Sequence, residues 1–176
     1  MRTSRPLFAD IANVTFASTA ATNSLISPMS RSGLALPANY FVPGKILRLT
    51  VRGFFSTTGT PTLQLQFNLD STAVFDTTAL TMPSSVTNQK FELKGEIACQ
   101  AQGSSGTLMA QGSFLLLPLV GSGLGNVQGV DVGGTSALSI NTGTQHVFDL
   151  TETWGTSSAS NTITRTHLLL EDLDIN

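Results

Sequence analysis

The feature that most constrains the fold is a strict alternation of apolar and polar side chains over several long segments of the chain. In the segment 45–55, Leu47 and Leu49 begin a series of apolar residues separated by polar ones. Residues 62–70 and 90–100 repeat the pattern. A period of two predicts β-strands with one buried face and one solvent-exposed face.

Short turns rich in Gly, Pro, Ser and Thr separate these segments and indicate three antiparallel hairpins. The predicted hairpins pair 45–55 with 62–70, 90–100 with 107–117, and 147–154 with 163–173. Shorter strands at 13–18 and 136–140 bring the count to about eight, and no segment is convincingly helical. This spacing predicts an all-β fold, an antiparallel β-sandwich of jelly-roll type.

The inward positions of these strands predict the core. Hydrophobic residues make up 40% of the chain, which is enough for a sizeable interior. We expect the following side chains to lie between the two sheets: Leu47, Leu49, Val51, Leu63, Leu65, Phe67, Leu93, Ile97 and Phe114.

Charge excludes some function classes. Nine Lys and Arg residues against eleven Asp and Glu leave a net charge of -2, which argues against a nucleic-acid partner because phosphate binding needs a basic surface. Charged residues are only 11% of the chain, so its surface is rich in hydroxyl groups instead. Such a surface is typical of a protein packed in an assembly.

The N-terminal region is expected to differ from the rest of the chain. We predict an extended arm over 1–12 and one β-sandwich domain over 13–176. Asp10 and Asn13 interrupt the first apolar residues, so no signal peptide is expected. No segment reaches the roughly 20 apolar residues of a membrane span, so no membrane partner is expected either. The single Cys99 excludes an internal disulfide and favours synthesis in a reducing compartment.

Residues that could perform catalysis are few. His146 and Asp149 are three apart on one predicted strand, which places them on opposite faces. His167 could be combined with Ser104 or Ser105, but the chain has no nucleophile elbow of the Gly-x-Ser-x-Gly type. We therefore interpret both histidines as polar strand residues.

The remaining candidates also favour structural roles. Cys99 lies on an apolar face and is expected to be buried. Glu92 and Glu96 alternate with lysines, which predicts a ladder of mixed charge on an exposed strand rather than a carboxylate pair for glycoside hydrolysis. Asp172 and Asp174 offer too few oxygens for a calcium loop, and the glycines of 121–134 form no phosphate loop. No cofactor or metal is expected.

Several segments predict subunit contacts. The loop 118–135 is both glycine-rich and apolar, and contiguous exposed apolar residues usually mark interfaces. Glu152 falls on an apolar face and Phe54 on a wet one, which indicates either an error in strand phase or a subunit interface. The arm is expected to bind an acidic partner surface, such as the segment 171–174 of a neighbouring subunit. The predicted interface residues are Arg2, Arg5, Phe8, Ile11, Phe54, Leu119, Val120, Leu124, Val127 and Val130.

Three hairpin motifs carry a resemblance to a known family. They are PGKILRLTVRGFFSTTGTPTL at 43–63, GTLMAQG at 106–112, and WGT at 154–156 followed by NTIT at 161–164. With these motifs the chain resembles small jelly-roll-like structural proteins of tailed bacteriophages. The resemblance implies a virion component without catalytic residues, and trimers are common among such proteins.

Composition and resemblance together favour a non-enzymatic phage virion protein. Our leading hypothesis is a capsid decoration (cement) protein, a homotrimer that binds the major capsid protein on the capsid exterior after synthesis in the bacterial host cytoplasm. The alternative is a tail- or baseplate-associated protein, including a receptor-binding module with tail proteins as partners. A glycan-processing enzyme is the least favoured class, because no paired carboxylates lie in a plausible site.

Overall fold

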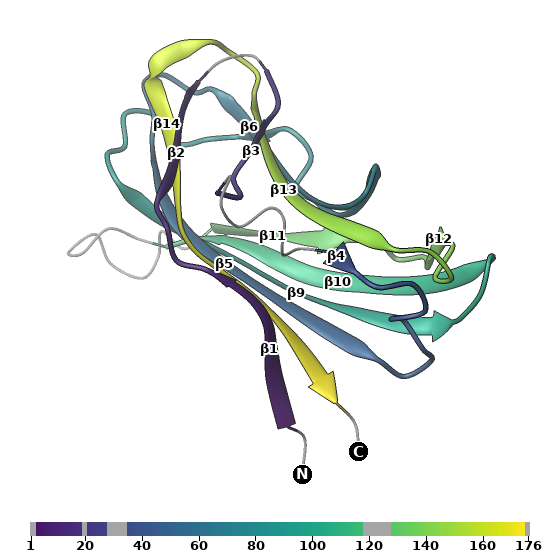
Figure 1. Ribbon diagram of the computed structural model, residues 1–176. Helices are drawn as coiled ribbons and strands as arrows, with labels where there is room; N and C mark the ends of the chain where they lie inside the picture. The colour runs from purple at the N-terminus through teal and green to yellow at the C-terminus, as the bar shows by residue number, and fades with distance from the viewer. Residues whose placement is uncertain (1–2, 19–20, 28–34, 118–127, 175–176) are drawn as a thin grey trace.

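The chain folds into two antiparallel β-sheets packed face to face, and Figure 1 shows both layers of this computed structural model. The structure describes residues 3–18, 21–27, 35–117 and 128–174. Within these ranges all regular elements are strands, as the alternating sequence predicts. The all-β sandwich prediction is therefore confirmed.

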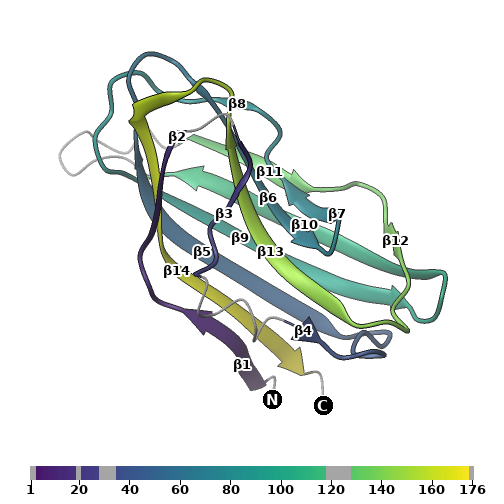
Figure 2. The same cartoon turned by 45° about the horizontal axis from the view of Figure 1, so that its top comes forward.

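The larger sheet contains eight strands in the order β1-β14-β5-β9-β10-β11, with β2 also paired to β14 and β12 to β10. The bounds of these strands are β1 Thr3–Asp10, β2 Val14–Ser18, β5 Ile46–Ser56, β9 Gln89–Ala101, β10 Gly106–Leu116, β11 Gln128–Gly133, β12 Leu138–Ile140 and β14 Ser158–Asp174. Figure 2 shows β5, β9 and β10 running side by side as long neighbours.

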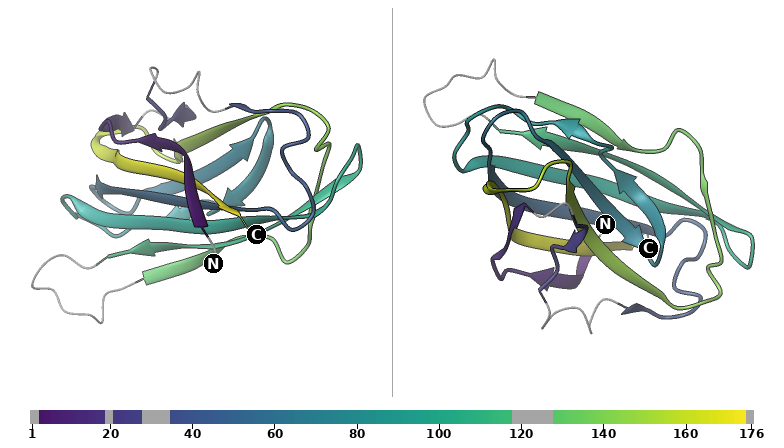
Figure 3. Two further views of the ribbon diagram at one scale, coloured as in Figure 1. Left: turned by 60° about the horizontal axis from the view of Figure 1, so that its bottom comes forward. Right: turned by 90° about the horizontal axis from the view of Figure 1, so that it is seen from above.

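The smaller sheet contains six strands in the order β3-β13-β6-β7, with β4 also paired to β13 and β8 to β6. Its strands are β3 Asn23–Ser24, β4 Ala35–Leu36, β6 Thr62–Leu69, β7 Thr72–Asp76, β8 Leu80–Thr81 and β13 His146–Trp154. This sheet covers one face of the larger sheet, as the two views of Figure 3 show. Among the described residues, no second layer covers the opposite face of the larger sheet in these views.

The connectivity of the eight main strands is that of a jelly roll. In the larger sheet β2, β14, β5 and β9 are successive neighbours, and in the smaller sheet β3, β13, β6 and β7 are. The chain changes sheet six times, between β2 and β3, β4 and β5, β5 and β6, β8 and β9, β12 and β13, and β13 and β14. Two sheets linked in this way have the jelly-roll arrangement predicted from the sequence. Strands β10, β11 and β12 extend the larger sheet beyond β9.

Two of the three predicted hairpins are wrong. β5 and β6 lie in different sheets, and so do β13 and β14, so neither pair shares a ladder. The alternation does not distinguish the two arrangements. A strand that buries one face has the same pattern whether the next strand in the sequence lies in its own sheet or in the opposite sheet. The hairpin of β9 with β10 is confirmed by a long antiparallel ladder, whose register shifts once, between Thr107 and Leu108.

The predicted core is confirmed. All nine residues expected between the sheets are buried, and Phe67 is 0% exposed. The rings of Phe67 and Phe148 stack with centroids 5.0 Å apart. Gly95 leaves space in the core for the ring of Phe75 on the opposite sheet, because a Cβ atom at position 95 would lie 2.3 Å from that ring.

The segment predicted as an extended arm contains edge strand β1. It pairs with the end of β14 in the same chain, with Phe8 opposite Leu170 and a bulge between Pro6 and Phe8. The start of β1 and the end of β14 consequently lie side by side at one end of the sandwich (Figure 1). Phe8 is partly buried against the core, which explains how a short terminal segment is held in place.

Candidate binding surface

The outer face of the larger sheet, which points away from the smaller sheet, carries its side chains in cross-strand rows. Register fixes these rows, because residues opposite each other on neighbouring strands project from the same face. The rows across β5, β9 and β10 are Ile46-Ala98-Met109, Arg48-Glu96-Gln111, Thr50-Lys94-Ser113 and Arg52-Glu92-Leu115. An apolar row therefore lies next to rows of charged and polar groups.

Ion pairs link the charged rows. Arg48 donates from Nε and Nη2 to the same oxygen of Glu96, Oε1, at 3.1 and 2.8 Å. Arg52 donates from Nε to Glu92 Oε2 at 2.7 Å, and Lys94 Nζ lies 2.7 Å from Glu92 Oε1. The mixed charge ladder predicted on this strand is confirmed, and β5 supplies its missing partners.

This pairing argues against acid–base chemistry at Glu92. Burial raises the pKa of Glu92, but the hydrogen bonds from Lys94 and Arg52 outweigh burial and bring the pKa below its usual value. A glycoside hydrolase needs a general acid with a raised pKa. Glu92 is therefore better suited to holding the neighbouring Arg52 and Lys94 than to donating a proton.

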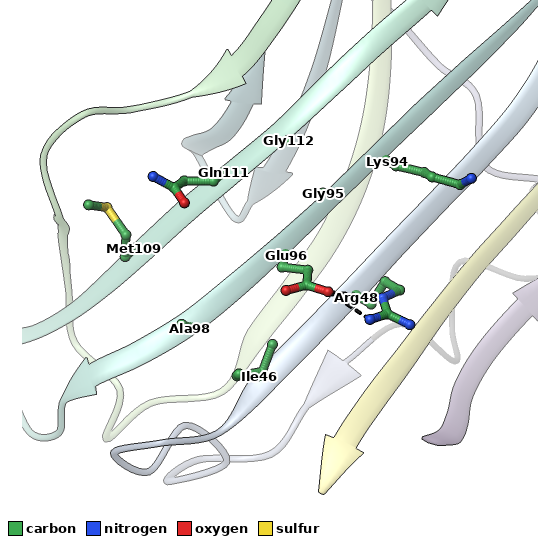
Figure 4. Close-up of a pocket in the computed structure, with 9 residues that line it drawn as sticks. All are labelled: Ile46, Arg48, Lys94, Gly95, Glu96, Ala98, Met109, Gln111 and Gly112. Atoms are coloured by element: carbon green, nitrogen blue, oxygen red, sulfur yellow. Dashed lines mark hydrogen bonds and ion pairs between the residues drawn. The ribbon is translucent and has the colours of Figure 1, made fainter. Parts of the chain in front are cut away.

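A hollow opens on this outer face where β5, β9 and β10 run side by side (Figure 4). Its volume is about 410 Å³. Gly95 and Gly112 are opposite each other in register and contribute main-chain atoms but no side chains to the lining. The side chains around it are Ile46, Arg48, Lys94, Glu96, Ala98, Met109 and Gln111. The hollow is thus edged by both apolar and polar side chains.

Those predicted interface residues that the structure describes do not form one patch. Arg5 lies 3.9 Å from buried Asp172 of the same chain, and Ile11 is 78% exposed at the end of β1. Phe54 is half-buried on the outer face opposite Lys90, and Val130 packs against the core from β11. Arg2, Leu119, Val120, Leu124 and Val127 lie outside the described residues. Contact of these residues with other subunits stays a prediction.

A buried ion pair between Arg165 and Asp10 joins β14 to the N-terminal region. The alternation pattern does not reveal it. Arg165 is 0% exposed and its Nη2 donates to Asp10 Oδ2 at 2.6 Å. Arg165 also donates to the main-chain oxygens of Leu25, Asp10 and Ala12 at 2.8 to 2.9 Å. Burial raises the pKa of Asp10, but hydrogen bonds from Arg165, Ser27 and Ala12 lower it below its usual value overall.

Two further buried polar residues are placed by the structure. Glu152 is 0% exposed within the single chain, so its assigned strand phase was correct and its burial needs no partner subunit. Burial raises the pKa of Glu152, although Asn23 donates to its Oε1 at 2.8 Å. His146 bridges Asp70 Oδ2 at 2.7 Å and the main-chain oxygen of Asn141 at 2.9 Å, and so joins two loops.

The other chemical candidates also have structural surroundings. Cys99 is buried as predicted, and burial raises the pKa of its thiol, which disfavours the reactive thiolate. Across the described residues, no group of three or more His, Cys, Asp or Glu side chains is arranged to hold a metal ion. Those same ranges contain no helix long and apolar enough to cross a membrane.

Comparison with known proteins gives a structural likeness only. No family model matches the chain, and no curated protein matches it either. Among solved structures it is similar to the CBM2 module of the evolved Dit protein of Lactobacillus casei BL23 phage J-1, with 11% identity and a TM-score of 0.37. The match covers 99% of this chain and 98% of that module.

Proposed function

We propose that this chain is a non-enzymatic β-sandwich component of a phage virion that works by binding, and that it belongs to the tail rather than to the capsid exterior. The observation that carries the proposal is the outer face of the larger sheet, where ordered rows of side chains surround a hollow of about 410 Å³. The sequence motifs at 43–63 and 106–112 supply the resemblance to phage structural proteins.

The distribution of apolar side chains favours the tail over capsid decoration. Clamping capsomers needs a broad apolar docking surface, since stable interfaces bury a large, largely apolar centre. Among the described residues, the exposed large hydrophobic side chains are Ile11, Val42 and Val147, which lie on separate segments. A hollow with polar and apolar edges is instead typical of a ligand site.

Self-association remains part of the proposal. The trimer predicted from the sequence would be a closed cyclic assembly, as most homo-oligomers are. Sedimentation of the purified chain at micromolar concentration checks it, and a single species of 18.5 kDa would contradict it.

Copy number and location test the proposed function. The experiment combines quantitative gel densitometry of purified particles of the phage that encodes the chain with gold-labelled antibody in the electron microscope. We expect tens of copies per particle and gold at the tail. Hundreds of copies with gold over the head would support the decoration hypothesis instead, and absence from purified particles would refute both.

A further inference from the structure

The hollow on the outer face presents hydrogen-bond donors and an acceptor together. Both donors of Arg48 that bind Glu96 use Oε1, and Oε2 of Glu96, beside the hollow, has no hydrogen-bond partner in the described part of the chain. The exposed Gln111 stands opposite Glu96 on β10, and its side chain forms no hydrogen bond within the described residues. An amide carries a donor and an acceptor at once. The polar edge can therefore give and accept hydrogen bonds over a short span.

The other edge of the hollow is apolar. Ile46, Ala98 and Met109 are opposite one another in register and form one row beside the polar edge. All three side chains are partly exposed, so this row can bury apolar surface of a ligand. The hollow thus suits a small group with hydroxyls on one side and C–H surface on the other.

We propose that this hollow binds a short segment of saccharide, whose hydroxyls would face Glu96 and Gln111 while a ring face would lie on Ile46, Ala98 and Met109. The inference rests on the proposed function, because it names the ligand of the same surface. A hydroxyl both donates and accepts, which matches the polar edge better than a group that does only one.

Other ligand classes fit less well. The open carboxylate oxygen of Glu96 repels an anion, while Arg48 and Lys94 repel a cation. An extended peptide gains most of its affinity by adding to the edge of a sheet, and the hollow lies on a sheet face whose strands are already paired on both sides. The volume of about 410 Å³ lies in the usual range for small-ligand sites.

The test begins with a printed array of bacterial cell-wall and capsule oligosaccharides, probed with the full chain. The brightest glycan is then titrated into ¹⁵N-labelled protein. We expect the backbone amide signals of Gly95 and Gly112 to shift with ligand. Gln111→Ala should weaken binding about fivefold, as the loss of one neutral hydrogen bond does.

Two further variants separate the ligand classes. Glu96→Gln removes the negative charge while keeping the shape of the side chain. It should therefore lower the affinity for a saccharide severalfold, whereas it would raise the affinity for an anionic ligand. Ala98→Trp fills the hollow and should abolish binding. Lys90→Ala is the matched control, because it lies on the same face and the same strand but outside the hollow, and its affinity should be unchanged.

The outcomes distinguish this inference from the proposed function. No binding to any glycan on the array, signal shifts confined to other parts of the chain, or equal affinity for Gln111→Ala and Lys90→Ala would each overturn the saccharide site. A chain located on the phage tail that binds no saccharide leaves the proposed function standing. A chain that binds saccharide in the hollow but is absent from virions would support the saccharide site and refute the proposed function.

Discussion

Replacing Arg165 with methionine should be among the most damaging single substitutions in this chain. Arg165 is fully buried and holds Asp10, Ala12 and Leu25 by four hydrogen bonds. Methionine has a similar reach but no donors, so Arg165→Met leaves the Asp10 carboxylate buried without its counter-charge. Removing one partner of a buried pair costs about 3–5 kcal/mol. That is a large share of the 5–15 kcal/mol by which domains are typically stable.

The chain provides its own probe for the measurement. Trp154 is the only tryptophan and is 1% exposed, so its fluorescence reports unfolding in urea. The matched control is Arg48→Met, which breaks the exposed pair with Glu96 and should cost less than about 1 kcal/mol. The reasoning would be refuted by a loss for Arg165→Met no larger than that of Arg48→Met.

The same pair predicts a response to acid. The folded pKa of Asp10 lies below its unfolded value, so its contribution to stability is complete above the unfolded pKa of about 3.9. The contribution is lost as the pH falls through the lower folded pKa. Asp10→Asn should show a smaller loss of stability over that acidic range than the wild type, measured as the urea midpoint against pH.

Three further outcomes are expected. Phe67→Ala should lower the free energy of unfolding by about 3–5 kcal/mol, whereas Val147→Ala, at a side chain 45% exposed, should change it by under about 0.5 kcal/mol in the same urea titration. The pKa of Glu152 is higher in the folded chain than the unfolded value of about 4.3, so the free energy of unfolding should fall as the pH rises from about 4.3 through the folded pKa. Glu152→Gln should flatten this part of the plot of stability against pH. Cys99 should react with a thiol reagent far more slowly in the native chain than in urea, and equal rates would show that it is not buried.

Strand positions and the core could be predicted because burial leaves a local mark on the sequence. Leu47 and Phe67 are buried because each falls on the inward phase of its own strand, whichever strand lies alongside. Pairing could not be predicted in the same way. β5 and β6 are adjacent in sequence yet lie in different sheets, and only tertiary packing decides between a hairpin and this arrangement.

The candidate surface was partly predictable. The charges from Lys90 to Glu96 marked a wet face, but their pairing with Arg48 and Arg52 depends on a register that the sequence does not reveal. Arg165 was missed because a charged residue does not suggest burial. One signal was present, since Arg165 has the same strand phase as Ile163, whose side chain is buried in the core. A bulge between Arg165 and His167 then shifts the phase of the strand, which conceals the pattern.

Blocking the outer face on intact phage tests the central claim most directly. Particles carrying Gln111→Cys are labelled with a bulky maleimide, and native Cys99 does not compete because it is buried and its thiol pKa is raised. Val147→Cys, exposed on the smaller sheet, is the labelled control. We expect label at position 111 to slow adsorption to host cells and label at position 147 to leave adsorption unchanged. Equal adsorption by both labelled particles and by unlabelled phage would contradict a binding role for this face.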